Sequence, residues 1–168
     1  WFLSTKIWDV HVLDIAVTDL VRLIRNRRAS YPVVLDLGCG NGRSFQYLWK
    51  QFDPELIIGA DIDRTMLEKA AEEADRLPVE IGLVQGNSSR LGLADGSVDL
   101  LFCHQTFHHL VAQEEAIAEF RRVLRPGGLL LFAESTRCFI HSWTIRYLFR
   151  HPMDKQKSAE QYVLLIRK

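Results

Sequence analysis

The stretch VVLDLGCGNGRSF, residues 33–45, constrains the fold most, because three glycines at alternate positions separate an apolar run from a helical pattern. The short, continuous apolar run is typical of a parallel strand buried on both faces. Gly38, Gly40 and Gly42 can adopt positive φ and allow a ligand to approach the backbone. One glycine usually suffices for a tight turn, so three favour a ligand-binding loop.

Segments with strand and helix character alternate along the rest of the chain. Strands are expected at PVVLDLG, ELIIGAD, VEIGLVQG, VDLLFCH and LLLFAE, with RPGG ending the helix before the last of them. Helices are expected over residues 7–28, 45–52, from 64 onward, and over 116–124, 139–150 and 158–167. This alternation predicts parallel strands with right-handed crossovers, and therefore an α/β, doubly wound sheet. No repeat or long linker interrupts it, so residues 1–168 are expected to form a single domain.

Composition and charge exclude several classes of function. Lys+Arg and Asp+Glu balance at 21 each, which argues against a nucleic-acid partner. No apolar run reaches the roughly 18 residues that span a bilayer, and the first ten residues lack the layout of a signal peptide. Cys39, Cys103 and Cys138 are odd in number and widely spaced, which predicts buried free thiols rather than disulfides or a metal site. We therefore expect a cytoplasmic protein with no transmembrane segment.

The spacing of the glycine loop narrows the class of ligand. In the dinucleotide fingerprint GxGxxG the third glycine comes one residue later than it does here, and no GxxxxGK[ST] loop is present. Asp61 ends the second expected strand roughly 20 residues after the loop, where an acid can accept hydrogen bonds from ribose hydroxyls. The pattern fits an adenosine-containing cofactor.

With these residues in place, the chain resembles the class I S-adenosylmethionine-dependent methyltransferases, of the broad type that includes the ubiquinone and menaquinone biosynthesis enzymes. The matching stretches, in order, are VLDLGCGNG at 34–42, IIGADIDRTML at 57–67, VQGNSSRLGLADGSVDLLFCHQTFHHL at 84–110 and FRRVLRPGGLLLFAE at 120–134. The resemblance implies a Rossmann-like methyltransferase fold with a cofactor-binding core over residues 33–135. The family's sheet usually has two further strands, which we expect this chain to lack.

The resemblance also implies where S-adenosyl-L-methionine, or its product S-adenosyl-L-homocysteine, would bind. Asp36 and the backbone of Gly38, Cys39 and Gly40 would line the methionine moiety. At the opposite end of the cofactor, the binding residues would be Asp61 on the ribose hydroxyls, Ile62 on the adenine ring, and Asn87 and Ser88 at the adenine edge.

One departure from the family pattern affects the adenine end. The family usually has an aspartate at the position of Asn87. The asparagine carbonyl can also accept a hydrogen bond from the adenine amino group, although without the assistance of a charge. We therefore expect weaker cofactor binding, but not its loss.

His104 and Gln105, at the end of the fourth expected strand, would face the sulfonium. A phenol or another weakly acidic acceptor would need a base, and histidine titrates near neutral pH. The candidates are His104, His108 and His109, with His104 favoured by its position as the catalytic residue. The alternative for His108 and His109 is that they open a helix and serve packing and capping.

Two outer segments complete the predicted organisation. The N-terminal segment, residues 1–32, contains the helix expected over 7–28. This helix would cover the cofactor, and its arginine cluster would form a solvated helix end. The C-terminal helical segment, 136–168, combines apolar and aromatic residues with positive charges: Phe139, Ile140, Trp143, Tyr147, Leu148, Arg137, Arg146, Arg150, Lys155 and Lys157. This mixture suits an aromatic or lipid-like acceptor with an anionic group. The alternatives are an amphipathic helix that packs on the sheet with its charges in water, and a homodimer face.

The expected function is methyl transfer from S-adenosylmethionine to a small-molecule acceptor by in-line displacement, without a metal. Two alternatives remain open. The chain could be a non-catalytic cofactor-binding or regulatory module, an alternative that Asn87 and the expected lack of two strands keep open. It could also be an NAD-dependent oxidoreductase, although the glycine spacing argues against that.

Overall fold

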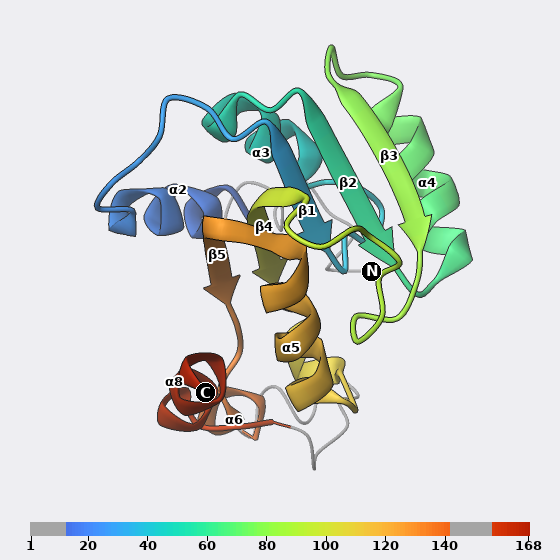
Figure 1. Cartoon of the computed structure of the whole chain (residues 1–168). Coiled ribbons are helices and arrows are strands. Elements are labelled where there is room, and N and C mark those ends of the chain that lie inside the picture. The colour runs from blue at the N-terminus through green and yellow to red at the C-terminus, as the bar shows by residue number, and fades with distance from the viewer. Residues whose placement is uncertain (1–12, 142–155) are drawn as a thin grey trace.

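A five-stranded sheet organises the computed structural model, which describes residues 13–141 and 156–168 (Figure 1). The strands are β1 (Val33–Leu37), β2 (Leu56–Asp61), β3 (Glu80–Gln85), β4 (Val98–His104) and β5 (Leu124–Ala133). All neighbouring strands pair in parallel, in the order β3-β2-β1-β4-β5. The strand order reverses between β1 and β4, which confirms the predicted α/β, doubly wound architecture.

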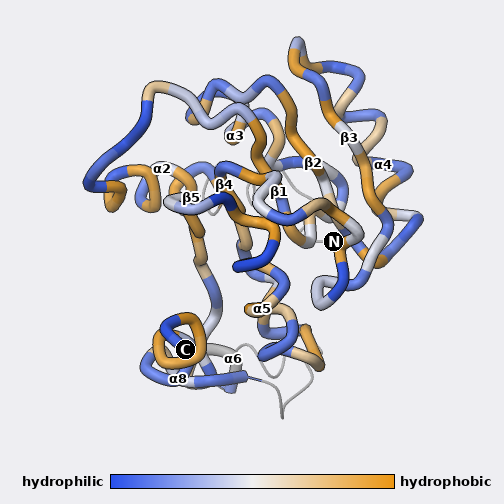
Figure 2. The backbone as a smooth tube through the Cα atoms, in the orientation of Figure 1, coloured by the Kyte–Doolittle hydropathy of each residue, from blue (hydrophilic) through white to orange (hydrophobic). Residues whose placement is uncertain are grey.

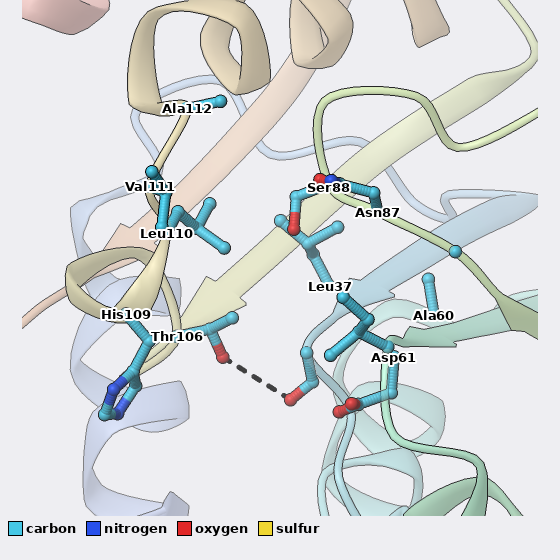
Figure 3. A pocket seen from close by; sticks show the side chains of 13 residues that line it. Leu37, Ala60, Asp61, Asn87, Ser88, Thr106, His109, Leu110, Val111 and Ala112 are labelled. Carbon is cyan, nitrogen blue, oxygen red and sulfur yellow. Dashed lines mark hydrogen bonds between the residues drawn. The ribbon is translucent and has the colours of Figure 1, made fainter.

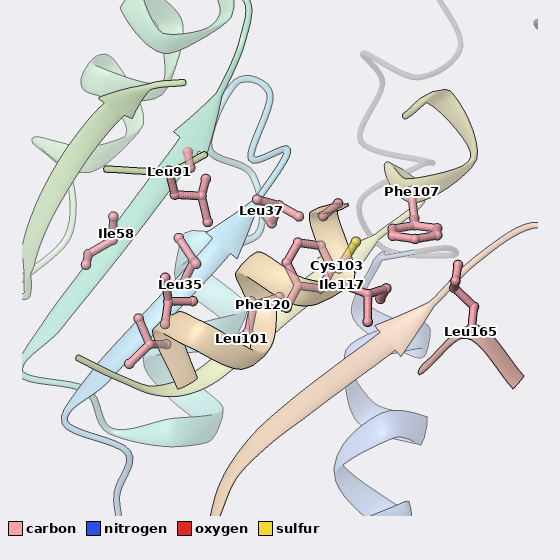
Figure 4. Packing of buried hydrophobic residues seen from close by; sticks show 14 of the residues in the cluster. Leu35, Leu37, Ile58, Leu91, Leu101, Cys103, Phe107, Ile117, Phe120 and Leu165 are labelled. Carbon is pink, nitrogen blue, oxygen red and sulfur yellow. The ribbon is translucent and has the colours of Figure 1, made fainter. Parts of the chain in front are cut away.

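Helices cover both faces of the sheet. They are α2 (Asp14–Leu23), α3 (Phe45–Phe52), α4 (Arg64–Ala74), α5 (Gln113–Val123), α6 (Arg137–Ile140) and α8 (Ala159–Arg167), with a 3-10 turn, η3, at Phe107–His109. One buried apolar cluster joins the sheet to α2, α3 and α4, and a second joins it to α5 and α8 (Figure 4). The described helices are too short or too polar to cross a membrane.

Alternation along β1 shows why its sequence is continuously apolar. Val34 belongs to the cluster under α2, α3 and α4, whereas Leu35 and Leu37 belong to the cluster under α5 and α8. All three side chains are at most 2% exposed. Figure 2 shows the same arrangement at larger scale, with apolar residues concentrated along the central strands and a hydrophilic segment after α2.

The N-terminal helix ends earlier than its sequence predicts. Residues 1–12 lie outside the described part of the chain, and α2 stops at Leu23 instead of continuing to residue 28. The arginines beyond it make tertiary contacts: the Arg27 guanidinium donates to the Gln51 carbonyl, and Arg28 Nη2 donates to the Gly127 carbonyl at 3.0 Å. The two arginines are exposed to solvent, as predicted, but they lie beyond the end of the helix and not on it.

The RPGG segment lies within a strand instead of ending a helix. Val98 pairs with Leu124 and Leu100 pairs with Leu129, so residues 125–128 bulge out of β5. Gly127 has a φ of +73°, which suits the bulge. β5 therefore begins five residues before the predicted strand LLLFAE. Its first residue, Leu124, is placed by its pairing with Val98, which is distant in the sequence and which local patterns do not reveal.

Beyond the bulge, β5 is an edge strand within the described residues. A groove of about 310 Å³ runs beside it, lined by Leu20 and Leu23 of α2, Ile24 directly after that helix, residues 129–132 of β5, and Ile166 of α8. The described residues contain these five strands and no further one, in line with the expected lack of the last two strands of the family sheet.

Asp99, 3% exposed, fastens the start of β4 to two neighbouring segments. It accepts hydrogen bonds from the Val33 amide at 2.9 Å and from Arg125 Nη1 at 2.8 and 3.0 Å. We expect Asp99→Ala to lower the free energy of unfolding by about 2–3 kcal/mol in urea denaturation, since it removes the buried carboxylate that the part-buried Val33 amide and the Arg125 guanidinium share as their acceptor. Asp95→Ala is the control, because that carboxylate is 82% exposed in its pair with Arg122 and should contribute little. Equal losses for both variants would contradict this role of Asp99.

Candidate functional site

Two adjoining cavities lie at the carboxyl ends of β1, β2 and β4. The larger cavity, about 390 Å³, includes Leu37, Ala60 and Asp61 in its wall (Figure 3). The smaller cavity, about 240 Å³, includes Asp36 and His104. Gly38 and Thr106 line both cavities. This edge, next to the reversal of strand order, is where doubly wound sheets bind their ligands.

The glycine loop after β1 separates the two cavities. Gly38, Gly40 and Gly42 have φ values of +70°, +54° and +78°, a conformation that glycine adopts readily because it has no side chain. The amides of Gly38 and Cys39 donate to the Ala60 carbonyl at 2.7 and 3.1 Å, which ties the loop to the end of β2. The loop therefore exposes backbone, and not side chains, to both cavities at Gly38.

Asp61 lies in the larger cavity with a fixed carboxylate. Its Oδ2 accepts from the Gly40 amide and its Oδ1 accepts from the Asp63 amide, each at 2.9 Å. Each oxygen keeps a second lone pair for another donor. The rest of the predicted adenosine set, Ile62, Asn87 and Ser88, lines the same cavity.

A buried acid and an arginine line the smaller cavity. Asp36 is 2% exposed and accepts a hydrogen bond from the Ser44 hydroxyl. The pKa of Asp36 is raised to about 7, mainly by burial. The hydrogen bond from Ser44 acts in the opposite direction, and the charge of Asp61 adds to the effect of burial. Arg43 lies in the wall of the same cavity, together with the predicted Cys39, Gly40, His104 and Gln105. The cavity therefore offers an acid for the ammonium end of a zwitterion and an arginine for its carboxylate end.

The cysteines are all free thiols, but they differ in exposure. Cys39 and Cys103 are buried, as predicted, whereas Cys138 is exposed, so the prediction is wrong for that residue. Burial is the main cause that raises the pKa of Cys39 far above its usual value. The thiol therefore stays protonated, and it acts as a neutral part of the cavity wall.

The three candidate histidines have different environments. His104 lines the smaller cavity and stacks on Phe102 with ring centroids 5.9 Å apart. Burial lowers the pKa of His104, against an opposing effect of Glu134, so its imidazole is neutral near pH 7. His108 is 2% exposed, and its Nδ1 lies 2.5 Å from Glu134 Oε1, which indicates a structural role. His109 lines the larger cavity.

Comparison with known proteins identifies the family. The family described as methyltransferase domain matches residues 35–132. The chain belongs to this family. The methyltransferase match covers β1 to β5 almost completely, and with it the loop and strand ends that line both cavities.

Individual relatives agree with the family. The chain is 39% identical over 103 residues to the malonyl-[acyl-carrier protein] O-methyltransferase of Methylococcus capsulatus, covering 60% of this chain and 36% of that protein. It is 36% identical over 112 residues to the trans-aconitate 2-methyltransferase of Deinococcus radiodurans, covering 67% and 40%. The chain spans less than half the length of these curated relatives.

A solved structure shares the fold. The methyltransferase in a complex with the Trm112 methyltransferase activator of Haloferax volcanii superimposes with a TM-score of 0.75 at 20% identity. The superposition covers 96% of this chain and 69% of that one. At that identity the likeness shows the fold alone.

Asn87 differs from the expectation for the methyltransferase site. Its Oδ1 already accepts from the amide of Ser89 at 3.1 Å and from the Ser89 hydroxyl at 3.0 Å. An adenine amino group would have to displace one of these donors. The turn after β3 therefore explains how an asparagine is accommodated here, but it does not supply a free carbonyl oxygen for adenine.

Several lining residues escaped the sequence analysis. Thr106, Leu110 and Val111 follow β4 and line the larger cavity, and Arg43 directly follows the glycine loop. Arg43 could have been predicted as a lining residue, because it is a cationic residue directly after GCGNG in the sequence. The others depend on the 3-10 turn at Phe107–His109, which sequence periodicity does not reveal. The predicted acceptor residues Trp143, Tyr147 and Leu148 lie outside the described residues, as do the side chains of Phe139 and Ile140.

Proposed function

We propose that this methyltransferase domain transfers a methyl group from S-adenosylmethionine to a small-molecule acceptor. The observation that carries the proposal is the pair of cavities that meet over Gly38, one with a fixed acid and the other with charges of both signs. Adenosine fits the larger cavity, the amino-acid end fits the smaller one, and the sulfonium lies between them. One relative is named for trans-aconitate, a small molecule, and another for a malonyl group carried on a protein, so both names support a small acceptor group.

In the larger cavity, Asp61 would accept hydrogen bonds from the ribose hydroxyls through the lone pairs left by Gly40 and Asp63. Ile62 and Val111 are 70% and 80% exposed and line the same cavity. Exposed aliphatic side chains at a cavity are stabilised when a flat, apolar ring covers them. We assign them to the two sides of the adenine.

In the smaller cavity, Asp36 would face the ammonium group and Arg43 the carboxylate of the amino-acid end. S-adenosylmethionine supplies, when bound, a methyl carbon that its sulfonium activates. The protein therefore needs no nucleophile of its own, and its residues align the reactants and exclude water, which can contribute roughly 7–11 kcal/mol. The neutral imidazole of His104 can accept a proton from an acceptor that carries one.

The charge state of Asp36 makes cofactor binding dependent on pH. Its raised pKa, about 7, means that the carboxyl is largely protonated at lower pH. The ammonium group favours the ionised form, so affinity for S-adenosylhomocysteine should rise about tenfold from about pH 6 to about pH 8. Calorimetric titration across this range measures the rise.

Two controls isolate Asp36 as the cause. Asp36→Asn should bind more weakly and with a flat pH profile, because the amide does not titrate. Methylthioadenosine, which lacks the amino-acid end, should show little pH dependence with the unchanged protein. A steep profile that persists in Asp36→Asn would assign the titration to another group.

The direct test of the proposed function is methyl transfer itself. The purified protein is incubated with methyl-labelled S-adenosylmethionine and small carboxylates, thiols, phenols and amines, and the release of S-adenosylhomocysteine is followed with the labelled product. The proposal expects turnover on at least one class and its loss in Asp61→Ala. Tight cofactor binding without turnover on any class would favour the non-catalytic binding module instead.

A further inference from the structure

The polar side chains that line the larger cavity lie at different ends of it. Asp61 lies at one end, and Asn87 and Ser88 lie at the other (Figure 3). The other polar residues of the lining belong to the segment that follows β4. With the ribose on Asp61, as in the proposed function, the far edge of the purine ring faces Asn87 and Ser88. That edge carries the substituent at position 6, which is an amino group in adenine.

The turn that contains Asn87 is held at a fixed place relative to Asp61. Asp61 pairs with Gln85 at the ends of β2 and β3, and the Gly86 amide donates to the Asp61 carbonyl at 3.0 Å. The turn then closes on itself, because the Arg90 amide donates to the Asn87 carbonyl at 2.8 Å. The backbone that carries the base-edge residues is therefore tied to the residue that would hold the ribose.

The Asn87 side chain has its only acceptor atom in use. Its Oδ1 accepts from the Ser89 amide at 3.1 Å and from the Ser89 hydroxyl at 3.0 Å. A backbone amide can only donate, so the side-chain atom that faces it is the oxygen and not the nitrogen. The two donors from Ser89 match the two lone pairs of Oδ1. The rest of the Asn87 head group is an NH₂, which donates and does not accept.

Adenine and a 6-oxopurine differ in what they offer at position 6. The amino group of adenine donates hydrogen bonds, whereas the carbonyl group of a 6-oxopurine accepts them. A site selects the amino group when it places an acceptor opposite, because a ligand without the donor leaves that acceptor unpaired. Asn87 can offer its oxygen only by losing a bond from Ser89, and the Ser88 hydroxyl can both donate and accept.

We propose that the purine end of this cavity does not select the 6-amino group. The site then binds 6-oxopurine analogues of the cofactor about as well as the adenine form. This inference rests on the proposed function, since it concerns the same cavity and names the class of nucleoside that the cavity takes. Asn87 and its partner Ser89 are the residues that determine this specificity.

The test compares S-adenosylhomocysteine with S-inosylhomocysteine, in which a carbonyl group replaces the 6-amino group of the purine. Calorimetric titration of the unchanged protein gives both dissociation constants. We expect S-inosylhomocysteine to bind no more than about threefold more weakly, which is less than one neutral hydrogen bond usually contributes. A larger preference for S-adenosylhomocysteine would overturn the inference. Binding of neither ligand would instead contradict the proposed function.

Asn87→Asp supplies the acceptor that the site lacks. One carboxylate oxygen can keep the bonds from Ser89, and the other replaces the NH₂ with an acceptor. The variant should prefer S-adenosylhomocysteine over S-inosylhomocysteine by about tenfold or more, the range for a hydrogen bond to a charged group. The added charge acts on both ligands and cancels in the ratio of their dissociation constants. An unchanged ratio would overturn the inference, because Asn87 would then not face position 6.

Ser89→Ala tests the role of the partner, which itself lines neither cavity. It removes one of the two donors to Asn87 Oδ1, so the freed lone pair can accept from the amino group of adenine. The preference for S-adenosylhomocysteine should rise about two- to tenfold. Ser97→Ala is the matched control, because the Ser97 hydroxyl donates to the Ala94 carbonyl at 2.7 Å in a turn further along the chain. No rise in Ser89→Ala, or an equal rise in Ser97→Ala, would overturn the inference.

Discussion

Gly38→Ala is expected to weaken S-adenosylhomocysteine binding by about 100-fold or more and to lower the free energy of unfolding by about 2–4 kcal/mol. Gly38 has a φ of +70°, and a Cβ atom there would lie 2.2 Å from both Thr106 Cγ2 and Thr106 Oγ1. Thr106 also donates a long hydrogen bond, 3.4 Å, to the Gly38 carbonyl (Figure 3). Displacing Thr106 would disturb the junction of both cavities. Calorimetry and urea denaturation measure the two effects.

Substitutions at two other glycines distinguish a loss of stability from a loss of cofactor binding. Gly92 has a φ of +72° with open space around its Cβ position, and it lines neither cavity, so Gly92→Ala should cost only about 1–2 kcal/mol and leave binding unchanged. Gly40 also has open space but lines the smaller cavity, so Gly40→Ala should impair binding more than stability. Normal binding by Gly38→Ala would contradict the arrangement of the cofactor across the loop.

Asp61→Ala is expected to reduce S-adenosylhomocysteine affinity by about 100-fold or more, because hydrogen bonds to a charged group contribute about 1.5–3 kcal/mol each. The variant removes the acceptor for the ribose hydroxyls and also leaves the Gly40 amide without the partner that it has at 2.9 Å. Asp61→Asn tests the charge separately and should give an intermediate loss. Calorimetric titration under one set of conditions compares the variants.

Asp63→Ala is the matched control for Asp61. Asp63 is the next acid along the chain, and its side chain caps α4 by accepting from the Thr65 amide at 2.8 Å. Its removal should weaken the helix and leave cofactor affinity nearly unchanged. An Asp61→Ala variant that binds as well as Asp63→Ala would place the ribose elsewhere.

The sequence predicted the features that depend on local patterns. The apolar run of β1 and the alternation of strands and helices were sufficient to predict the sheet, and the glycines were sufficient to predict a loop directly after β1 at the cavity. Every residue predicted to bind the cofactor lines one of the two cavities. They gather there because the carboxyl ends of parallel strands meet at one edge of a sheet.

The features that were missed depend on contacts between distant residues. Leu124 begins β5 only because it pairs with Val98, which turns RPGG into a bulge. Thr106 meets Gly38 across 68 residues, and Glu134 meets His108 across 26. No periodicity or turn signal encodes such pairs. The end of α2 at Leu23 belongs to the same group, since the arginines beyond it bind α3 and β5.

Calorimetric titration of the purified chain with S-adenosylhomocysteine, with NAD as the parallel ligand, tests the central claim most directly. The account predicts that one molecule of S-adenosylhomocysteine binds per chain and that NAD produces no binding heat. Binding of NAD without S-adenosylhomocysteine, or of neither ligand by folded protein, would contradict it.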